Sequence, residues 1–307
     1  MPENFDPQKF QEAGVKAILA SMMLVRPFVL GLKEYGDIEV KKHDDSLVTL
    51  VDSASEGVGI PILQTAFPDV PIICEESGVT RENPDSTWEM WMDGIDGTNA
   101  FTLGSSTPTI IICAYDRQKK QLVGCVVGEP STGRIWSACT GLGCHLNIYE
   151  MSASVSNLLK TQTCRVWDGD FAGKTVLIDV SHGFTRGKGD NKRQILTDAN
   201  INILFRNLQN KKIKVLILGS NGLNHALVAN GNSGMVGCIT TAMGGPWDTP
   251  TLLGIEAGGY GCGIRINNDR TLSETGILDP LSYDIAIAAG SQRALDFLSE
   301  CVLNCVE

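Results

Sequence analysis

The sequence has little of what several large protein classes require. Its 307 residues include only 4 histidines, which are scattered, and only 6% aromatic residues. Lys and Arg number 25 against 35 Asp and Glu, which gives a formal net charge of −10. Nucleic-acid polymers and anionic membranes both require a basic face. We therefore expect neither as a partner, and no metal site built on histidine pairs.

Long apolar runs are also missing, and we expect no secretory leader. The most apolar N-terminal run, residues 17–25, is followed by Arg26 and Pro27 and falls short of the ~20 residues that a bilayer span requires. The first six residues lack the basic-then-apolar order of a signal peptide. The ten cysteines lie mostly in apolar stretches, which is typical of buried, reduced thiols. These features predict a cytoplasmic, globular protein.

The first 150 residues predict helices packed on a largely antiparallel sheet. Asp6 and Pro7 are typical of a helix start, and the apolar pattern continues to about Val25. Strands are expected over residues 107–115 and 121–128, joined by a polar turn. We therefore expect an N-terminal α+β half over residues 1–150.

From residue 151 the pattern changes to alternating strands and helices. Apolar runs predict strands over 174–180, 214–218 and 235–240. Helices are expected over 192–208, 221–229, 248–257 and 283–301. This alternation predicts a C-terminal α/β half over residues 151–307.

Two Asp-Gly steps follow an aromatic-rich strand expected over residues 87–92. They place Asp93 and Asp96 in one small volume. Two carboxylates held close together repel, so such a pair is tolerated mainly where cations neutralise it, and hard oxygen ligands favour Mg²⁺. Asp-Gly is also ordinary turn chemistry, so other acids must support a metal site.

Three other acids occupy comparable places. Glu75 follows a short apolar run that predicts a buried strand. Asp52 lies at the start of a helix expected over 53–65, and Asp248 lies just before another expected helix. Either aspartate could instead be a helix N-cap.

The order of these motifs resembles the lithium-sensitive, magnesium-dependent phosphomonoesterase superfamily. The motifs are Val-Thr-x-x-Asp at residues 48–52, Glu-Glu-Ser at 75–77, Asp-x-x-Asp-Gly-Thr at 93–98 and Trp-Asp at 247–248. The superfamily contains inositol monophosphatase, inositol polyphosphate 1-phosphatase and 3'(2'),5'-bisphosphate nucleotidase. The resemblance implies an α/β (α+β) fold, a layered α-β-α-β-α sandwich with the site between the halves.

The resemblance also implies roles for individual residues. Glu75, Asp93 and the Ile95 carbonyl would bind one Mg²⁺, and Asp93, Asp96 and Asp248 would bind a second. A third, weaker ion would lie near Glu75, and Li⁺ would inhibit. Asp52 and Thr98 would be catalytic, with the threonine orienting a water molecule. The phosphate and substrate contacts would be Gly97, Thr98, Ser181, His182, Lys188, Ser220 and Thr241.

Several positions depart from the family pattern. Gly94 stands where the family usually has proline, which predicts a looser turn. Thr241 stands where monophosphatases carry a glutamate, seven residues before the late aspartate, which argues against a plain inositol monophosphatase. Residues 181–193 are unusually basic and could receive a second phosphate, or could simply form a solvated loop.

Two bisphosphorylated substrates fit a second phosphate site. One is an inositol polyphosphate such as inositol 1,4-bisphosphate, which would lose its 1-phosphate; the other is 3'-phosphoadenosine 5'-phosphate. The hairpin end at residues 115–116 resembles the polyphosphate phosphatases, although the long insertion before Asp93 is missing. Residues 245–246 replace the lysine that many nucleotidases have there. We favour an inositol polyphosphate 1-phosphatase, a monomer or homodimer acting on a small phosphate ester; a catalytically silent Mg²⁺-binding relative is the non-enzyme alternative.

Overall fold

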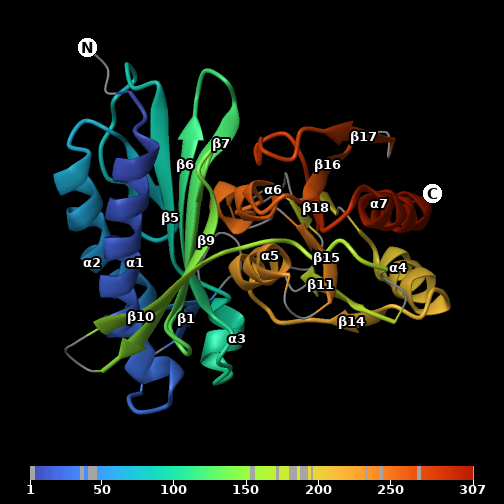
Figure 1. Ribbon diagram of the computed structural model, residues 1–307, viewed down its shortest axis with the longest axis horizontal. Helices are drawn as coiled ribbons and strands as arrows, with labels where there is room; N and C mark the ends of the chain where they lie inside the picture. The colour runs from blue at the N-terminus through green and yellow to red at the C-terminus, as the bar shows by residue number, and fades with distance from the viewer. Residues whose placement is uncertain are drawn as a thin grey trace.

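The chain folds into five alternating layers of helix and sheet, seen side by side in Figure 1. The computed structural model describes residues 4–34, 38–40, 47–152, 156–170, 173–179, 185–186, 193–194, 196–231, 234–241, 245–267 and 271–306. No helix in these ranges is long and apolar enough to cross a bilayer. All ten cysteines are free thiols, and nine of them are buried.

The first sheet has eight strands among the described residues, in the order β10-β9-β8-β7-β6-β5-β3-β4. Every adjacent pair is antiparallel except β3 and β5, which confirms the expected character of this region. The strands are β3 Ile72–Cys74, β4 Gly78–Val79, β5 Trp88–Asp96, β6 Thr109–Asp116, β7 Gln121–Glu129, β8 Arg134–Cys139, β9 Gly143–Met151 and β10 Ser156–Thr163. The last strand therefore lies beyond residue 150 and still belongs to the first sheet.

Helices α1 (Pro7–Val29) and α2 (Leu50–Ala66) cover the outer face of this sheet (Figure 1). The side chain of Asp6 caps α1 by accepting from the Lys9 N–H, as its position before proline predicts. Thr49 caps α2. The apolar faces of both helices join one core with β5, β6 and β7. Because these helices pack on the sheet, they hold the strand ends that carry the site.

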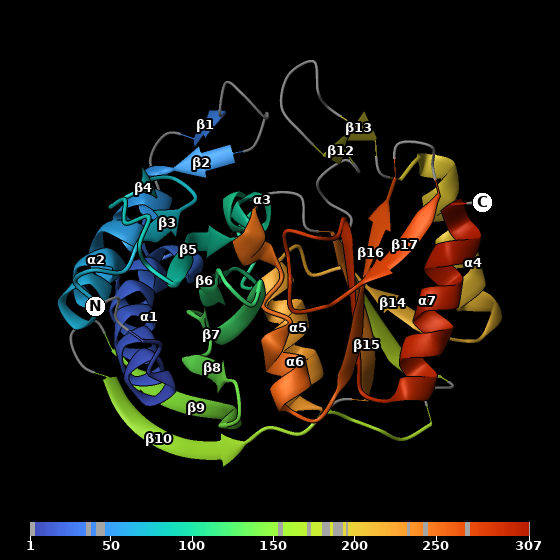
Figure 2. The same ribbon diagram turned by 90° about the horizontal axis from the view of Figure 1, so that it is seen from above.

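The second sheet has six strands among the described residues, in the order β14-β11-β15-β18-β16-β17. Helices α4 and α7 cover its outer face, while α5 and α6 fill the layer between the sheets (Figure 2). The strands are β11 Thr175–Asp179, β14 Lys214–Leu216, β15 Met235–Thr241, β16 Tyr260–Ile266, β17 Leu272–Thr275 and β18 Ile285–Ala289. The helices are α4 Asp198–Asn210, α5 Asn221–Asn230, α6 Leu252–Glu256 and α7 Gln292–Val306.

Six short elements complete the described fold. Strands β1 Ile38–Val40 and β2 Leu47–Thr49 form one antiparallel pair, and β12 Thr185–Arg186 and β13 Arg193–Gln194 form another. Helix α3 spans Thr98–Thr102, and the 3₁₀ helix η2 spans Pro246–Asp248.

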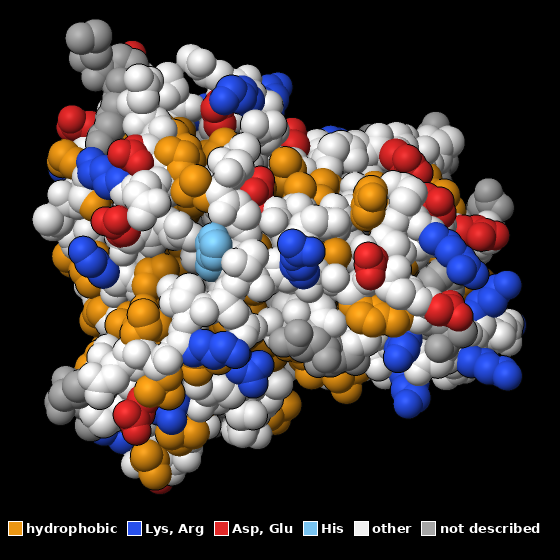
Figure 3. All heavy atoms as spheres, in the orientation of Figure 1, with side chains coloured by type: hydrophobic (Ala, Val, Ile, Leu, Met, Phe, Trp, Pro, Cys, Tyr) orange, Lys and Arg blue, Asp and Glu red, His pale blue; other side chains and the backbone are white. Residues whose placement is uncertain are grey.

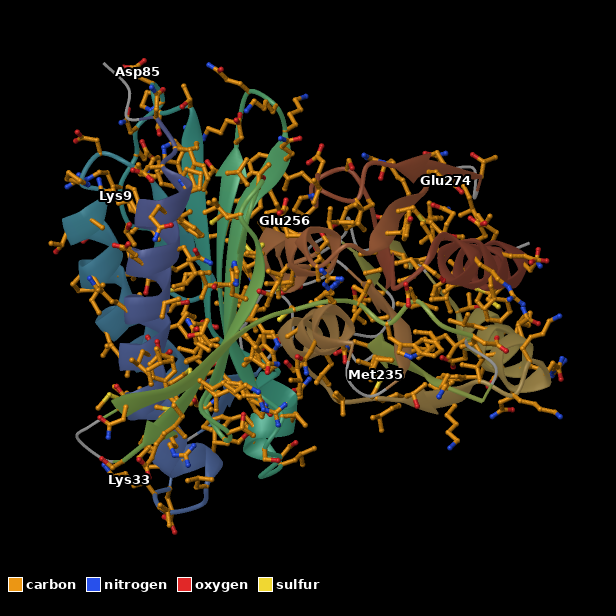
Figure 4. The ribbon with its side chains drawn as sticks, viewed as in Figure 1. Lys9, Lys33, Asp85, Met235, Glu256 and Glu274 are labelled. Atoms are coloured by element: carbon orange, nitrogen blue, oxygen red, sulfur yellow. The ribbon has the colours of Figure 1, made fainter. Side chains whose placement is uncertain are left out.

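The two sheets are joined through the middle helix layer. Apolar side chains of β5 and β6 pack with those of α5 and α6 in one core, which includes Trp91, Ile111, Leu223 and Leu252. Glu256, labelled in Figure 4, links α6 to the first sheet because its carboxylate accepts from the N–H groups at residues 141 and 143. The surface away from these contacts is mixed in charge: acidic, basic and apolar side chains alternate on the face in Figure 3.

Three predicted helices in the second half were partly wrong. Residues 285–289 of the helix expected over 283–301 form strand β18, because this fully buried segment lies between β15 and β16 as a central strand. Helix α4 begins only at Asp198, after a short strand pair. The segment 248–257 starts as the 3₁₀ helix η2 and continues as α6 only from Leu252.

Candidate active site

The site begins at the end of strand β5, where the chain bulges. The β5–β6 ladder is regular up to Asp93 and resumes at Asp96, so two residues intervene on β5. The Asp93 carboxylate accepts from the Ile95 N–H at 2.8 Å, which stabilises the bulge. Both aspartates are buried, at 4% and 6% exposure. The two Asp-Gly steps therefore form a β-bulge that holds both acids in fixed positions.

Glu75 lies next to Asp93 on the neighbouring parallel strand. Cys74 is aligned with Met92 in the β3–β5 ladder, and the Glu75 N–H donates to the Met92 carbonyl at 3.1 Å. The carboxyl ends of β3 and β5 therefore meet at one edge of the sheet. The charge of Glu75 contributes to the raised pKa of Asp93.

Asp96 is held by groups from the second half of the molecule. Its Oδ2 accepts from the Ser220 hydroxyl at 2.5 Å, from the Gly222 N–H at 2.8 Å and from the Thr109 hydroxyl at 2.8 Å. Among the described residues, its Oδ1 accepts one longer bond, 3.2 Å, from the Asn221 N–H. The start of helix α5 thus binds this carboxylate as helix N-termini bind anions, leaving Oδ1 the less engaged oxygen.

Asp248 approaches the same place from the segment after β15. It ends the 3₁₀ helix η2, which packs against β5 and β6, and its carboxylate accepts from the Gly245 N–H at 3.0 Å. It does not cap the following helix, whose N-cap position is Thr251. Its charge also raises the pKa of Asp93. The sequence motif Trp-Asp therefore brings a fourth acid to the site.

Asp52 and Thr98 form a hydrogen-bonded pair at the edge of the acids. The Thr98 hydroxyl lies 3.0 Å from Asp52 Oδ1 and 3.0 Å from the Ile95 carbonyl oxygen. Asp52 Oδ2 accepts from the backbone N–H of Thr49 at 2.9 Å and from its hydroxyl at 2.5 Å. Asp52 is therefore the N3 residue of a capping box whose N-cap is Thr49. Its other carboxylate oxygen, Oδ1, is available to Thr98.

The five acids, Asp52, Glu75, Asp93, Asp96 and Asp248, form an acidic cluster. Burial raises the pKa of Asp93 well above its usual range, and the four other acids raise it further. Burial raises the pKa of Asp96 to about 6, although hydrogen bonds from Ser220, Thr109 and Gly222 oppose the shift. Burial also raises the pKa of Asp52. Removing these carboxylates from water without a cation is thus unfavourable.

The acidic cluster matches a hard divalent cation in its donor chemistry. It offers carboxylate oxygens and the Ile95 carbonyl, which Mg²⁺ prefers. Within the described residues, no three His, Cys, Asp or Glu side chains converge closely enough to hold a metal ion as they stand. The fit to Mg²⁺ is thus one of donor chemistry.

Glycines permit two close approaches around the bulge. Gly97 has a φ of 90°, and a Cβ there would lie 2.3 Å from the Gly219 carbonyl oxygen. A Cβ on Gly94 would lie 2.5 Å from the Asp52 carbonyl oxygen, and the Gly94 carbonyl accepts from the Ser55 hydroxyl. Gly94 is thus packed against α2, and the looser turn predicted from it is not what the structure shows.

The remaining predicted contacts divide into two groups. Ser181, His182 and Lys188 lie outside the described residues. Ser220 is buried and its hydroxyl donates to Asp96, while Thr241 is buried at the end of β15 with its carbonyl accepting from Asn221 Nδ2 at 3.3 Å. The structure brings Ser220 to the acidic cluster as a partner of a carboxylate, a contact that the sequence did not predict.

Sequence reasoning also missed Glu56, Ser55 and Thr109. Each is fully buried and hydrogen bonded to a segment of the acidic cluster. Glu56 lies four residues after Asp52 in α2, so helical spacing could have placed both on one face. Thr109 and Ser55 offered no such signal, since their partners depend on the tertiary packing.

The five layers and the buried acidic cluster define a class: a mixed α/β sandwich with an acidic site between two sheets. Within that class, the sequence model of the inositol monophosphatase family matches residues 6–294, and the chain belongs to this family. The resemblance to the phosphomonoesterase superfamily is thereby confirmed. The narrower assignment to inositol polyphosphate 1-phosphatase stays a prediction.

Curated relatives match only part of the chain. The Nus factor SuhB of Escherichia coli K12 is 31% identical over 116 residues, which cover 38% of this chain and 42% of that protein. The protein of the same name from Haemophilus influenzae is 34% identical over 107 residues, 35% of this chain and 39% of its own. The chain therefore aligns with less than half the length of these relatives.

Solved structures match almost the whole chain at low identity. The IMPase of Thermotoga maritima has a TM-score of 0.67 at 18% identity, covering 96% of this chain and 98% of that one. The suhB protein of Bartonella henselae has a TM-score of 0.68 at 20% identity, covering 94% and 97%. An IMPase/NADP phosphatase, complexed with NADP and Ca²⁺, has a TM-score of 0.65 at 16% identity, covering 96% and 97%. These likenesses support the fold.

Proposed function

We propose that the protein is a Mg²⁺-dependent phosphomonoesterase acting on a small phosphorylated metabolite. The observation that supports this most is the buried acidic cluster, in which acids from three separate segments surround Asp93 beside a hydrogen-bonded Thr98. Such a concentration of buried negative charge is unfavourable by itself and suits a site that binds cations. Family membership supports the same chemistry.

The ligand assignment follows the family resemblance and the positions of the acids. Glu75, Asp93 and the Ile95 carbonyl would hold one Mg²⁺, and Asp93 would share a second with Asp96 and Asp248. Bound Mg²⁺ supplies charge for the phosphoryl oxygens and lowers the pKa of a water molecule. Asp96 has its less engaged oxygen, Oδ1, available for this role.

Thr98 has one hydroxyl proton and two acceptors at equal distance. When it donates to Asp52, the Ile95 carbonyl oxygen is left free for a cation. The Thr98 oxygen can then accept a hydrogen bond from an attacking water molecule, with Asp52 fixing the orientation of the hydroxyl. The Gly97 and Thr98 amides lie at the start of α3 and would face the phosphate. This arrangement orients the water toward the phosphorus without requiring threonine to act as a base.

Our preferred substrate is an inositol polyphosphate that loses its 1-phosphate, such as inositol 1,4-bisphosphate. The test measures phosphate release from inositol 1,4-bisphosphate, inositol 1-phosphate and 3'-phosphoadenosine 5'-phosphate, each with Mg²⁺ and with EDTA. We expect Mg²⁺-dependent release that is fastest from inositol 1,4-bisphosphate and is inhibited as Li⁺ is titrated. Fastest release from the adenosine bisphosphate would assign a nucleotidase instead. No release from any substrate would reject a phosphatase in favour of a silent Mg²⁺-binding protein.

A further inference from the structure

Helix α2 carries a buried carboxylate that the chemistry above does not use. Glu56 is 0% exposed. Its Oε1 accepts from the Glu76 N–H at 2.9 Å, and its Oε2 accepts from the Ser77 N–H at 2.8 Å and from the Ser77 hydroxyl at 2.6 Å. All three donors belong to the two residues that immediately follow Glu75. Both carboxylate oxygens are therefore engaged in holding the strand end that bears a proposed metal ligand.

The same face of α2 also holds the second ligand segment. Asp52, Ser55 and Glu56 are spaced i, i+3 and i+4, which places them on one side of the helix. The Ser55 hydroxyl donates to the Gly94 carbonyl at 2.8 Å, and Asp52 accepts from Thr98. One helix face thus contacts both ligand-bearing segments, at residues 75–77 and 93–98.

Helix α2 is itself firmly fixed. The Ser21 hydroxyl of α1 donates to the Ser55 carbonyl at 2.8 Å, and both serines are fully buried. On the other side, Gly94 lies so near α2 that a Cβ would come within 2.5 Å of the Asp52 carbonyl oxygen and 3.0 Å of Glu56 Cγ. Because the helix cannot shift freely, its hydrogen bonds define where the two segments lie relative to each other.

We propose that Glu56 is a positioning residue that sets the place of Glu75 relative to Asp93 and thereby the affinity of the site for Mg²⁺. The inference rests on the proposed function. Hydrogen-bonding partners behind the ligands of a metal typically change its affinity 10–100-fold when they are removed. Glu56 acts in this way through the backbone of residues 76 and 77 and through the Ser77 hydroxyl, and not by binding the substrate.

The test compares Glu56→Gln, Ser77→Ala and the control Glu82→Gln in the full-length protein. Glutamine has one acceptor oxygen and an NH₂ group that would face donors, whereas Ser77→Ala removes one bond of three. Glu82 is exposed and does not belong to the acidic cluster, so Glu82→Gln removes the same charge without changing the site. Mg²⁺ binding is measured by calorimetry in the absence of substrate, and half-saturation by Mg²⁺ is then measured in the phosphatase assay.

We expect Mg²⁺ binding to weaken roughly 10-fold or more in Glu56→Gln, a few-fold in Ser77→Ala and not at all in Glu82→Gln. At saturating Mg²⁺, kcat of Glu56→Gln should recover toward the unmodified value, which a general loss of structure would not allow. Unchanged Mg²⁺ affinity in Glu56→Gln overturns the proposal; if that variant does not fold, unchanged affinity in Ser77→Ala overturns it. Failure of the unmodified protein to bind Mg²⁺ would instead reject the proposed function.

Discussion

The two halves of the molecule contribute different chemistry to one site. The first sheet and its helices supply four of the five acids of the cluster, all at strand ends or at the start of a helix. The second half supplies Asp248 and the hydrogen-bond donors at the start of α5. The first half therefore carries most of the negative charge, and residues 220–222 of the second half supply three of the four hydrogen bonds described for Asp96. This contrast teaches that one carboxylate of the cluster is held mainly by a layer other than the one that carries it.

The contrast extends to how each contribution is fixed. The bulge at Asp93 is built into a nine-residue strand that is buried along its whole length. Three of the four donors described for Asp96, in contrast, come from residues 220–222 at the start of α5, which meet the first sheet only when the two halves pack together. We expect substitutions of the acids, including Asp248 in the second half, to act on cation binding, and substitutions at the start of α5 to act through Asp96.

The largest effect should come from removing one proposed metal ligand from each half of the molecule. Asp93→Asn and Asp248→Asn are each expected to lower kcat by roughly a thousandfold, since cation binding supplies several kcal/mol of charge stabilisation. Both variants remove a repelling charge, so their melting temperatures in EDTA should not fall. Full Mg²⁺-dependent activity in Asp248→Asn would confine the metal ligands to the first half. It would then be wrong that both halves contribute ligands to one site.

A smaller loss is expected where the first half orients water. Thr98→Ala removes the hydroxyl bonded to Asp52 and should lower kcat by about 100-fold, in the range for positioned proton-transfer groups. Mg²⁺ affinity, measured by calorimetry, should not change because the Ile95 carbonyl and the acids are retained. Unaltered kinetics would reject the water-orienting role.

Two glycines near α2 should respond in opposite directions. Gly94→Ala places a Cβ against the Asp52 carbonyl oxygen and should lower the free energy of unfolding by about 1–3 kcal/mol. Gly57→Ala, on the exposed side of α2, meets nothing within 4 Å and should raise it by roughly 0.5–1 kcal/mol. Urea titration measures both. Equal effects would mean that the bulge is not held tightly against the helix.

The smallest effect is a pH dependence of Mg²⁺ stabilisation. Burial raises the pKa of Asp96 in the folded protein to about 6, above the ordinary 3.8. Protonation of Asp96 therefore stabilises the metal-free protein. This stabilisation is fully present below pH 3.8 and is lost as the pH rises through 6. Mg²⁺ competes with those protons. The rise in melting temperature on adding Mg²⁺ should therefore grow by a few degrees from pH 5 to pH 7.5. NaCl serves as the ionic-strength control. A Mg²⁺-induced rise in melting temperature that is the same at both pH values would show that Asp96 does not bind the cation.

The sequence was informative where local patterns decide structure. Proline after Asp6 predicted the start of α1, and the placement of Asp93 and Glu75 after apolar runs predicted an acid at each of two strand ends, which the structure brings side by side. The alternating pattern failed for Ile285–Ala289, since a fully buried central strand shows no alternation and its alanines also favour helix. Local pattern alone does not separate these two cases.

The site was predictable only in its acids. The Ser220 hydroxyl and its partner Asp96 are 124 positions apart, so no spacing rule connects them. Thr109 likewise reaches Asp96 because β6 pairs with β5 across the bulge. Glu56 could be placed on the face of Asp52 by helical spacing, but its partners in residues 76–77 follow from how α2 packs. The sequence motifs predicted the acids of the site, whereas the groups that donate hydrogen bonds to them depend on tertiary packing.

The start of helix α5 has a consequence for synthesis of the chain. Asp96 is translated more than a hundred residues before the donors at 220–222 that bind its carboxylate. While the ribosome is still making the second half, the nascent first half can offer that carboxylate only the Thr109 hydroxyl among its described donors. Completion of the site is thus a late event in biogenesis, and a ribosome-stalled chain ending before residue 220 should not acquire a finished cation pocket.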